Sequence, residues 1–220
     1  MRTVKLYNLI SSSSNGNSIV YRDEVLVDIG VKFSDLAPYL EKVKYILLTH
    51  RHSDHIRKST VKRIVKERPD IEWFFGEHLL HILEEFNIPN IHIVEVNKAY
   101  NLGSDIKISP IKLYHDVENF GYRIVFRDKK KIIHATDTAH LDGIVAKDYD
   151  LYALEYNHDE LRIEREIEEK LEKGEFCYEI GAKNSHLSFQ KCIKFFEENR
   201  KVDSELLKLH ISHKYKGENV

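Results

Sequence analysis

Apolar residues occur along this chain in short runs, which are separated by polar turns or by amphipathic segments. Short runs rich in β-branched and aromatic residues predict strands, and apolar residues spaced three and four apart predict helices. The predicted strands are Thr3–Ile10, Ile19–Arg22, Val25–Ile29, Val43–Thr49, Ile71–Phe75, Ile91–Val96, Ile106–Tyr114, Gly121–Phe126, Lys131–Thr136, Leu151–Tyr156 and Glu205–His210. The predicted helices are Phe33–Glu41, Asp54–Glu67, Glu77–Phe86, Ala139–Val145, Asp159–Glu175 and Ser188–Asn199. The polar stretch Ser11–Ser18 is predicted to be a tight turn.

The predicted strands form two groups that are interleaved with helices. This order favours an α/β fold in which two β-sheets pack face to face and the helices lie outside, a four-layer αββα sandwich. No linker rich in proline or glycine divides the two halves. We therefore expect residues 1–220 to form one domain.

The composition is that of an ordinary globular protein. A chain of 220 residues, 42% hydrophobic and 32% charged, is long enough to bury a core without disulfides. No apolar run is long enough to cross a bilayer and the N-terminus lacks the shape of a signal peptide, so no membrane association is expected. Cys177 and Cys192 have no paired spacing, which favours a reducing, cytoplasmic location. The net charge of −2 gives no global attraction to nucleic acid, so phosphate binding would need a local patch.

Four metal-binding side chains follow the strand Val43–Thr49 within six positions: His50, His52, Asp54 and His55. Alternation in an extended segment puts the two histidines at positions 50 and 52 on one side, so that both can reach one ion. The aspartate and histidine at positions 54 and 55 lie past a turn, where they can hold a second ion. Imidazole and carboxylate without thiolate suit zinc, manganese or iron bound for hydrolysis.

Further acidic or histidine side chains stand at the carboxyl ends of other apolar runs. They are His115, Asp137, Glu155 and His210. Strand ends on one rim of a sheet converge on a common edge, where a site is rigid yet open to solvent. These positions are candidates for the remaining ligands.

With these residues the sequence resembles the metallo-β-lactamase superfamily of metallohydrolases. The signature H-x-H-x-D-H is matched in full at positions 50–55, and Asp28-Ile29-Gly30 is similar to the family's early D-x-G. The segment 210–215 is similar to the terminal H-x-S-x-R-Y of the tRNase Z branch, which favours His210 over His213 as the last ligand. The resemblance implies that His50, His52 and His115 bind one metal, that Asp54, His55 and His210 bind the other, and that Asp137 lies between them.

Finer details resemble the YycJ-like exonucleases and the tRNase Z branch. Glu155-Tyr156-Asn157-His158-Asp159 and Ser185-His186-Leu187-Ser188 are similar to the E-x-N-H-D and H-L-S elements of the former, and Ser12–Ser18 is similar to their S-G-S-x-G-N-S turn. The resemblance makes His186, supported by Glu155, the candidate proton donor. It leaves Lys214, Tyr122 and Asn17 as candidate phosphate contacts.

The resulting hypothesis is a metal-dependent hydrolase of phosphodiester bonds with two divalent ions, Zn²⁺ by default and Mn²⁺ as the alternative. Two such ions give a bridging hydroxide at neutral pH and neutralise phosphate oxygens, while Asp54 both binds metal and orients the water. A DNA exonuclease is the first choice. A cyclic-nucleotide or RNA phosphodiesterase is the second, and a thioester hydrolase of the glyoxalase II kind is a third. The partner is then nucleic acid or a nucleotide.

Two charged surfaces have alternative interpretations. Lys58, Lys62 and Lys66 form a stripe on one predicted helix, which is either a solvated face or a track for nucleic-acid backbone. The charged helix Asp159–Glu175 is either solvated or part of a homodimer contact. The sequence leaves both choices open, and His158 and Asp159 are weighed evenly between a functional and a structural role.

Overall fold

The structure is a computed structural model that describes residues 5–212 and 214. The chain divides into two compact units, with the boundary between Leu102 and Gly103. The single domain expected from the sequence stays a prediction. His213 lies outside the described residues.

The first unit contains a six-stranded sheet in the order β1-β2-β3-β4-β5-β6. The first three strands pair antiparallel and the last four pair parallel. The strands are β1 (Tyr7–Ser13), β2 (Gly16–Tyr21), β3 (Val25–Val27), β4 (Tyr45–Leu47), β5 (Glu72–Phe75) and β6 (Ile91–Ile93). Because β3 and β4 are parallel, their carboxyl ends meet at the same edge of the sheet.

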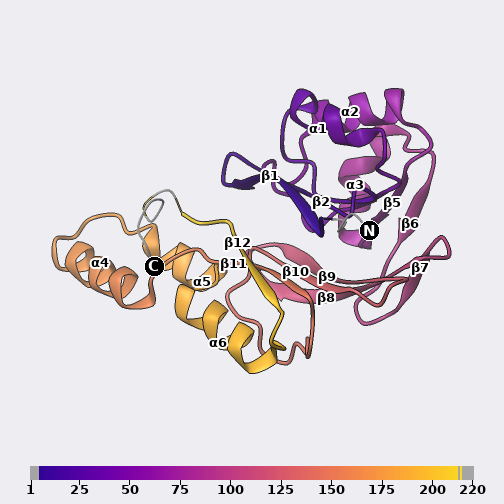
Figure 1. Cartoon of the computed structure of the whole chain (residues 1–220). Coiled ribbons are helices and arrows are strands. Elements are labelled where there is room, and N and C mark those ends of the chain that lie inside the picture. The colour runs from indigo at the N-terminus through magenta and orange to yellow at the C-terminus, as the bar shows by residue number, and fades with distance from the viewer. Residues whose placement is uncertain (1–4, 213, 215–220) are drawn as a thin grey trace. The chain divides into compact units, whose positions relative to one another are not determined.

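Helices of the first unit cover the apolar side chains of its sheet. They are α1 (Phe33–Leu40), α2 (Lys58–Glu67) and α3 (Leu80–Leu83), with the single 3-10 turns η1 (Glu77–Leu79) and η2 (Glu84–Phe86) on either side of α3. Helices α1 and α2 pack against each other (Figure 1). They bury Leu36, Val61 and Ile64 in one core with Leu26 and Ile46 of the sheet.

The second sheet has the order β12-β11-β10-β9-β8-β7. Its strands are β7 (Tyr100–Leu102), β8 (Ile106–Tyr114), β9 (Glu118–Phe126), β10 (Lys131–Ala135), β11 (Leu151–Glu155) and β12 (Glu205–Leu209). Strands β8, β9 and β10 are antiparallel neighbours, whereas β10, β11 and β12 are parallel. It follows that β8, β10, β11 and β12 all point the same way, so their carboxyl ends share one edge.

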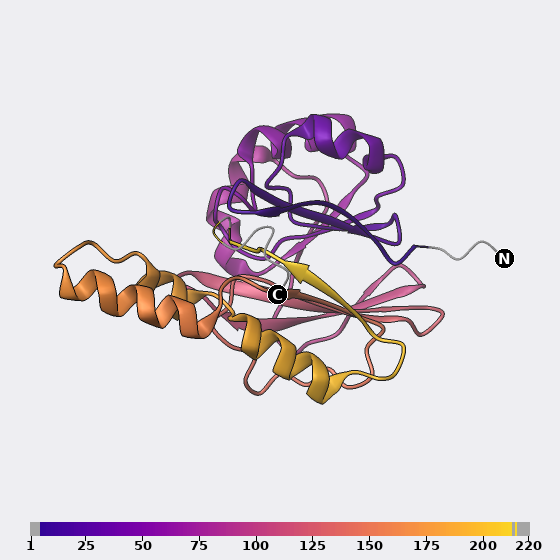
Figure 2. The same cartoon turned by 60° about the vertical axis from the view of Figure 1, so that its left-hand side comes forward.

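Among its described residues the second unit has the helices α4 (Glu160–Glu172), α5 (Glu179–Ser185) and α6 (Phe189–Asn199). Helix α6 lies against the sheet, whereas α4 projects past the ends of the strands (Figure 2). The apolar face of α6 supplies Cys192, Phe195 and Phe196 to a core that includes Tyr152 and Leu154 of β11. None of the helices in the described ranges is long and apolar enough to cross a membrane.

The predicted α/β class with two sheets and flanking helices is confirmed, but three local predictions are wrong. Ala139–Val145 is a series of turns and not a helix, since Gly143 has a φ of +75° and the Thr138 hydroxyl donates to the carbonyl of His140. The predicted turn Ser11–Ser18 is mostly strand, because β1 and β2 pair up to Ser13 and Gly16. Helix α2 starts only at Lys58, since Ile56 first forms a parallel bridge with Ile29.

Candidate metal centre

The first cluster comprises His50, His52, Asp54 and His55 and follows directly on β4. The imidazoles of His50 and His55 are fully buried, with ring centroids 4.0 Å apart. Nε2 of His50 lies 3.2 Å from Nδ1 of His52, and Nε2 of His55 lies 3.6 Å from Oδ2 of Asp54. The predicted four-residue motif is therefore gathered at one place in the first unit.

Asp28, which follows β3, orients the histidines of the first cluster from behind. Its Oδ2 atom lies 2.7 Å from Nδ1 of His55 and accepts a hydrogen bond from the Thr49 hydroxyl at 2.8 Å, while its Oδ1 accepts from the Thr49 amide. The same hydroxyl lies 3.0 Å from Nδ1 of His50. With Nδ1 engaged in both rings, Nε2 is the nitrogen that faces the cluster, the usual arrangement behind metal-binding histidines. In His55 this Nε2 atom lies 2.9 Å from the side-chain amide nitrogen of Asn17.

Asn17 holds the loop that carries Asp54. Its side-chain amide donates to the carbonyl of Ser13 at 3.0 Å and to Oδ2 of Asp54 at 3.1 Å, and its backbone amide donates to the carbonyl of Asp54 at 2.6 Å. Gly30 lies against the same loop so closely that a Cβ on it would come within 1.6 Å of the carbonyl oxygen of Asp54. The position of the Asp54 carboxylate is thus set by backbone contacts from two neighbouring segments.

The second cluster comprises Asp137, Glu155, His186 and His210 in the second unit. One potential ligand atom from each side chain lies within 4.8 Å of those of the others. Three of the residues come from the shared carboxyl edge of β10, β11 and β12, and the fourth, His186, follows α5. The convergence of strand ends predicted from the sequence is present in this unit.

Glu155 is the buried centre of the second cluster. Its Oε1 atom lies 2.6 Å from Nδ1 of His186 and 3.3 Å from Nδ1 of His210, and its Oε2 accepts hydrogen bonds from the amides of Thr138 and Leu187. Burial opposes ionisation of Glu155, but attraction to His186 and the hydrogen bonds from both histidines lower its pKa. Burial likewise lowers the pKa of His186, and the charge of Glu155 outweighs this effect and raises it. Glu155 is therefore ionised, and its negative charge favours the protonated imidazole of His186.

Left-handed backbone turns at the strand ends position polar side chains of the candidate site in both units. Asp28, Asp137 and His210 have positive φ angles of 58°, 56° and 49°, a region that aspartate and histidine enter more readily than most residues. The side-chain amide of Asn119 donates to the carbonyls of Thr136 and Asp137 and supports the second of these turns.

His115 follows β8 at the same edge as the second cluster. Its Nδ1 donates to the carbonyl of Ser185 at 2.9 Å, and its ring centroid lies 5.1 Å from that of His186. This hydrogen bond leaves Nε2 as the ring nitrogen that could bind a metal, and Nε2 lies 3.0 Å from Oδ1 of Asp116.

The remaining residues that were considered for the site from the sequence are buried or engaged in structural contacts. Tyr122 is fully buried in β9, so the prediction of a phosphate contact there is wrong. Asn17 is buried by its bonds to the Asp54 loop, and the ammonium of Lys214 pairs with Glu166. Asp159 caps α4 by accepting from the amide of Arg162 at 2.8 Å. His158 is buried, and burial lowers its pKa to about 4, so it is a neutral packing residue.

The supporting contacts of Asp28, Thr49 and Asn119 were not predicted from the sequence. The signal for Asp28 is present in the sequence, because a lone acid directly after a buried strand needs a partner when it is buried. No comparable signal marks the threonine or the asparagine, whose contacts depend on the fold.

The donor chemistry of the two clusters fits divalent metal ions. Two nitrogens on one tetrahedral zinc at about 2.0–2.1 Å lie about 3.3 Å apart, close to the 3.2 Å between the ring nitrogens of His50 and His52. Histidines backed by carboxylates and hydroxyls, as by Asp28 and Thr49, are typical of metal sites. The ligand types are those of zinc, manganese and iron sites and do not select among them.

Comparison with known proteins places this arrangement in a family. Residues 24–211 match the model of a beta-lactamase superfamily domain. Exodeoxyribonuclease WalJ of Streptococcus pneumoniae is 28% identical over 173 residues, which cover 70% of this chain and 62% of that protein. Exodeoxyribonuclease YycJ of Bacillus anthracis is 27% identical over 171 residues, with 70% of this chain and 63% of that protein covered. The matches thus span less than two thirds of these relatives.

Structural comparison supports the same grouping at the level of the fold. The crystal structure of the short form of human tRNase Z has a TM-score of 0.68 at 16% identity, and the match covers 96% of this chain and 93% of that one. The family model covers most of the chain, and the H-x-H-x-D-H motif forms a cluster with metal-binding chemistry. The resemblance read from the sequence is therefore confirmed, and the chain belongs to the beta-lactamase superfamily.

Proposed function

We propose that this protein is a metal-dependent phosphodiesterase that hydrolyses nucleic acid, with DNA as the first candidate substrate and exonucleolytic cleavage as the mode. The names of the two exodeoxyribonuclease relatives support this choice of substrate. Following the family resemblance, we assign His50, His52 and His115 to one divalent ion and Asp54, His55 and His210 to a second, with Asp137 bound to both. Zinc is the first candidate ion and manganese the second.

The observation that carries the proposal is the second cluster, with its short contact between Glu155 and His186. A hydrolytic site for phosphodiesters needs a group that gives a proton to the departing alkoxide. His186 is 18% exposed at its side chain, whereas Glu155 is completely buried. The histidine is thus the member of the pair that reaches solvent or substrate.

The chain's own residues then have separate tasks. The buried Glu155 holds the His186 ring by Nδ1 at 2.6 Å, which directs Nε2 outward as the proton-donating atom. Asp54, fixed by Asn17, orients the attacking water. Bound divalent ions would supply an acidified water and neutralise the phosphate oxygens. Asp28 keeps the Nε2 atom of His55 directed at the metal site.

Alternative substrates for the same residues are RNA and cyclic nucleotides. A thioester hydrolase of the glyoxalase II kind is a weaker candidate, because a thiolate leaves without a proton and would make little use of a paired Glu155 and His186. The cytoplasmic location and the homodimer that the sequence allows stay predictions.

The test is a substrate panel. Purified protein with added zinc or manganese is compared with a His50→Ala/Asp54→Ala variant on end-labelled DNA, RNA, cyclic nucleotides, bis(p-nitrophenyl) phosphate and a glutathione thioester. We expect metal-dependent release of mononucleotides from DNA by the wild type and loss of this activity in the variant and after chelation.

Other outcomes would contradict the proposal. Activity confined to cyclic nucleotides or to RNA would reject DNA as the substrate while leaving the phosphodiesterase assignment. Turnover of the thioester alone, or intact phosphate esters in metal-saturated protein, would reject the phosphodiesterase assignment itself.

A further inference from the structure

A cavity of about 610 Å³ opens beside the Asp54 loop in the first unit. Three cationic side chains line it together with Asp54: Arg51, Arg57 and Lys58. The polar turn between β1 and β2 contributes Ser14 and Asn15 to the same wall. A residue assigned to metal binding thus shares a cavity with three positive charges.

The two guanidinium groups of this cavity are uncompensated. Neither Arg51 nor Arg57 forms a side-chain hydrogen bond or an ion pair with any residue in the described ranges 5–212 and 214. Lys58 is engaged, since its ammonium lies 2.5 Å from Oε1 of Glu85. Planar guanidinium groups match the oxygens of phosphate in a bidentate manner and keep their charge at all physiological pH values.

The cavity is continuous in its lining with a smaller one of about 260 Å³. Asn15 and Arg57 line both cavities, and the smaller one adds Lys32 and Asp35, whose charges are opposite. The excess of positive charge is therefore confined to the larger cavity beside Asp54.

The wall next to Asp54 is held by backbone contacts. The amide of Arg57 donates to the carbonyl of Ile29 at 3.3 Å, and Ile29 forms a parallel bridge with Ile56. Gly30, which lines the cavity, packs directly on the backbone of Asp54. The attachment points of the cationic side chains are therefore fixed relative to Asp54, as a subsite at a set spacing requires.

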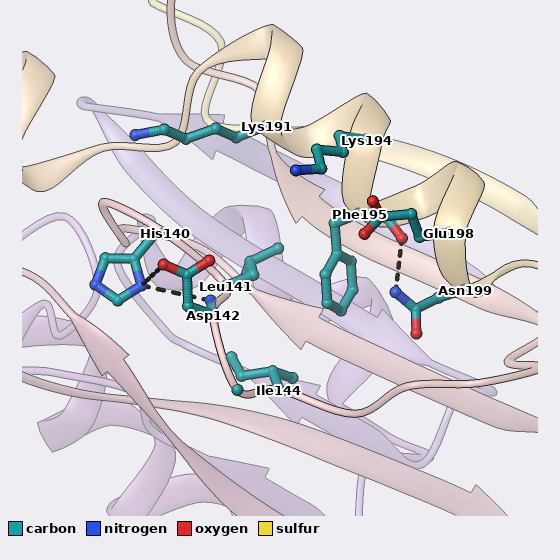
Figure 3. A pocket seen from close by; sticks show the side chains of 10 residues that line it. His140, Leu141, Asp142, Ile144, Lys191, Lys194, Phe195, Glu198 and Asn199 are labelled. Atoms are coloured by element: carbon teal, nitrogen blue, oxygen red, sulfur yellow. Dashed lines mark hydrogen bonds and ion pairs between the residues drawn. The ribbon is translucent and has the colours of Figure 1, made fainter.

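A second cavity, of about 480 Å³ in the second unit, differs in charge. Figure 3 shows Lys191 and Lys194 on α6 above Asp142 and Glu198, so its two lysines are matched by two acids. It contains none of the residues of the second cluster. The charges lining this cavity balance, whereas those lining the cavity beside Asp54 are mostly positive.

We propose that the cavity lined by Arg51 and Arg57 binds the phosphate adjacent to the scissile one in a polynucleotide strand. This rests on the proposed function and narrows its substrate class. A substrate needs at least two phosphates to use both positions, which selects a polynucleotide over a cyclic mononucleotide. The residues act in binding and not in the chemical step.

The test compares a dithymidine monophosphate, TpT, with the same molecule carrying a terminal phosphate, pTpT or TpTp. The wild type is expected to show a kcat/KM about tenfold higher for at least one phosphorylated form, the size of one charge-assisted contact to phosphate. In an Arg51→Ala/Arg57→Ala variant this preference for the second phosphate falls to about twofold or less. The readout is a ratio between substrates, so a general loss of activity does not imitate it.

Binding supplies a readout that needs no turnover. Fluorescence anisotropy of a labelled single-stranded oligonucleotide is followed as salt increases. Each phosphate that is neutralised contributes about 0.7 to the magnitude of the slope of log K against log salt for a single strand, so the double variant, which loses one phosphate, should lose about 0.7. The matched control is Lys62→Ala/Lys66→Ala, which removes two exposed charges from α2 outside the cavity and should alter the slope less.

The outcomes separate the two proposals. If TpT, pTpT and TpTp are hydrolysed equally by the wild type, the phosphate subsite is rejected and the phosphodiesterase stands. If no phosphate ester is hydrolysed, the proposed function fails and the salt slope alone decides the subsite. An equal loss of slope in the control variant would overturn the subsite, because it would assign binding to diffuse charge. Both arginines are exposed, and unchanged thermal unfolding will verify that the variants fold.

Discussion

Oδ2 of Asp28 lies 2.7 Å from Nδ1 of His55, and neither side chain is more than 2% exposed. The pair joins the ends of two parallel strands, because Asp28 follows β3 and His55 belongs to the turn after β4. A carboxylate in this place fixes the imidazole ring and strengthens Nε2 as a donor to metal.

Replacement of Asp28 by asparagine should weaken metal binding by about 10- to 100-fold, the usual cost of losing a supporting carboxylate. The physical reason is that an amide in place of the carboxylate no longer stabilises the ligating imidazole. The measurement is competition for zinc with a chromophoric chelator, together with metal content after dialysis. Asp35→Asn, on the exposed face of α1, is the control. Equal zinc affinity in the Asp28→Asn variant and the wild type would show that the contact has no part in metal binding.

The assignment of His186 as proton donor predicts a dependence on the leaving group. A nucleoside alkoxide needs a proton to depart, whereas p-nitrophenolate is stable as an anion at neutral pH. His186→Ala should therefore lower kcat on DNA by about 100-fold or more and lower kcat on bis(p-nitrophenyl) phosphate far less. The steady-state kinetics of the two substrates give the comparison. Equal losses on both would indicate that His186 binds metal or supports the fold instead.

Because of the low pKa of Asp150, replacing this residue should change the stability relative to the wild type by an amount that depends on pH. Burial opposes its ionisation, but hydrogen bonds from Lys130, Lys201 and the amide of Lys131 prevail and lower its pKa to about 2. Because the folded pKa lies below the unfolded value of 3.8, the ionised group stabilises the fold above about pH 4. This contribution is lost as the pH falls from about 4 toward 2.

Asp150→Asn should accordingly lower the free energy of unfolding at neutral pH by about 1–2 kcal/mol. The difference from the wild type should shrink below about pH 4. Urea unfolding at a series of pH values measures it, with the exposed Asp203→Asn as control. A difference that stays constant from neutral to acid pH would contradict the role of the two lysines.

Alanine substitutions at two glycines should change the stability of the protein in opposite directions. A Cβ on Gly30 would meet the carbonyl oxygen of Asp54 at 1.6 Å, and this neighbour is backbone that cannot rotate away. Gly30→Ala should destabilise the protein by about 3 kcal/mol, the upper part of the range for overpacking. Gly181 lies in α5 with open space around its Cβ position, so Gly181→Ala should stabilise by about 0.5–1 kcal/mol. Denaturant unfolding of both variants checks the pair, and a neutral Gly30→Ala would refute the close approach.

Most strands could be predicted from the sequence because short apolar runs rich in β-branched residues are typical of strands. The predicted bounds of β8, Ile106–Tyr114, agree with the structure at both ends. Strand β7 and helix α5 were missed because their sequences, Tyr100–Leu102 and Glu179–Ser185, are short and carry no apolar periodicity. The turns at 139–145 were misread as a helix because Leu141, Ile144 and Val145 have helical spacing, although hydrogen bonds from Thr138 and a glycine in positive φ decide otherwise.

The clustering of His50, His52, Asp54 and His55 was predictable since their spacing in the sequence suits one site. The pairing of Glu155 with His186 also followed from a resemblance, and the distance of 2.6 Å agrees with it. The cationic cavity was not predictable, because Arg51 lies inside the metal motif and Arg57 follows it, and both meet Ser14 and Asn15 only after the strands pair. Such a surface depends on which side chains stay unpaired in the fold, and sequence spacing alone does not contain that information.

The left-handed turns at Asp28, Asp137 and His210 make these positions tolerant of one further residue type. Asparagine enters the same backbone region easily, yet it binds a divalent ion poorly and supports a ligating histidine less well than a carboxylate does. A lineage that exchanged these residues for asparagine would keep the shape of its strand ends while losing its chemistry. Inactive descendants with an intact scaffold are therefore an accessible evolutionary outcome, and asparagine at these three places in a homologous sequence would identify one.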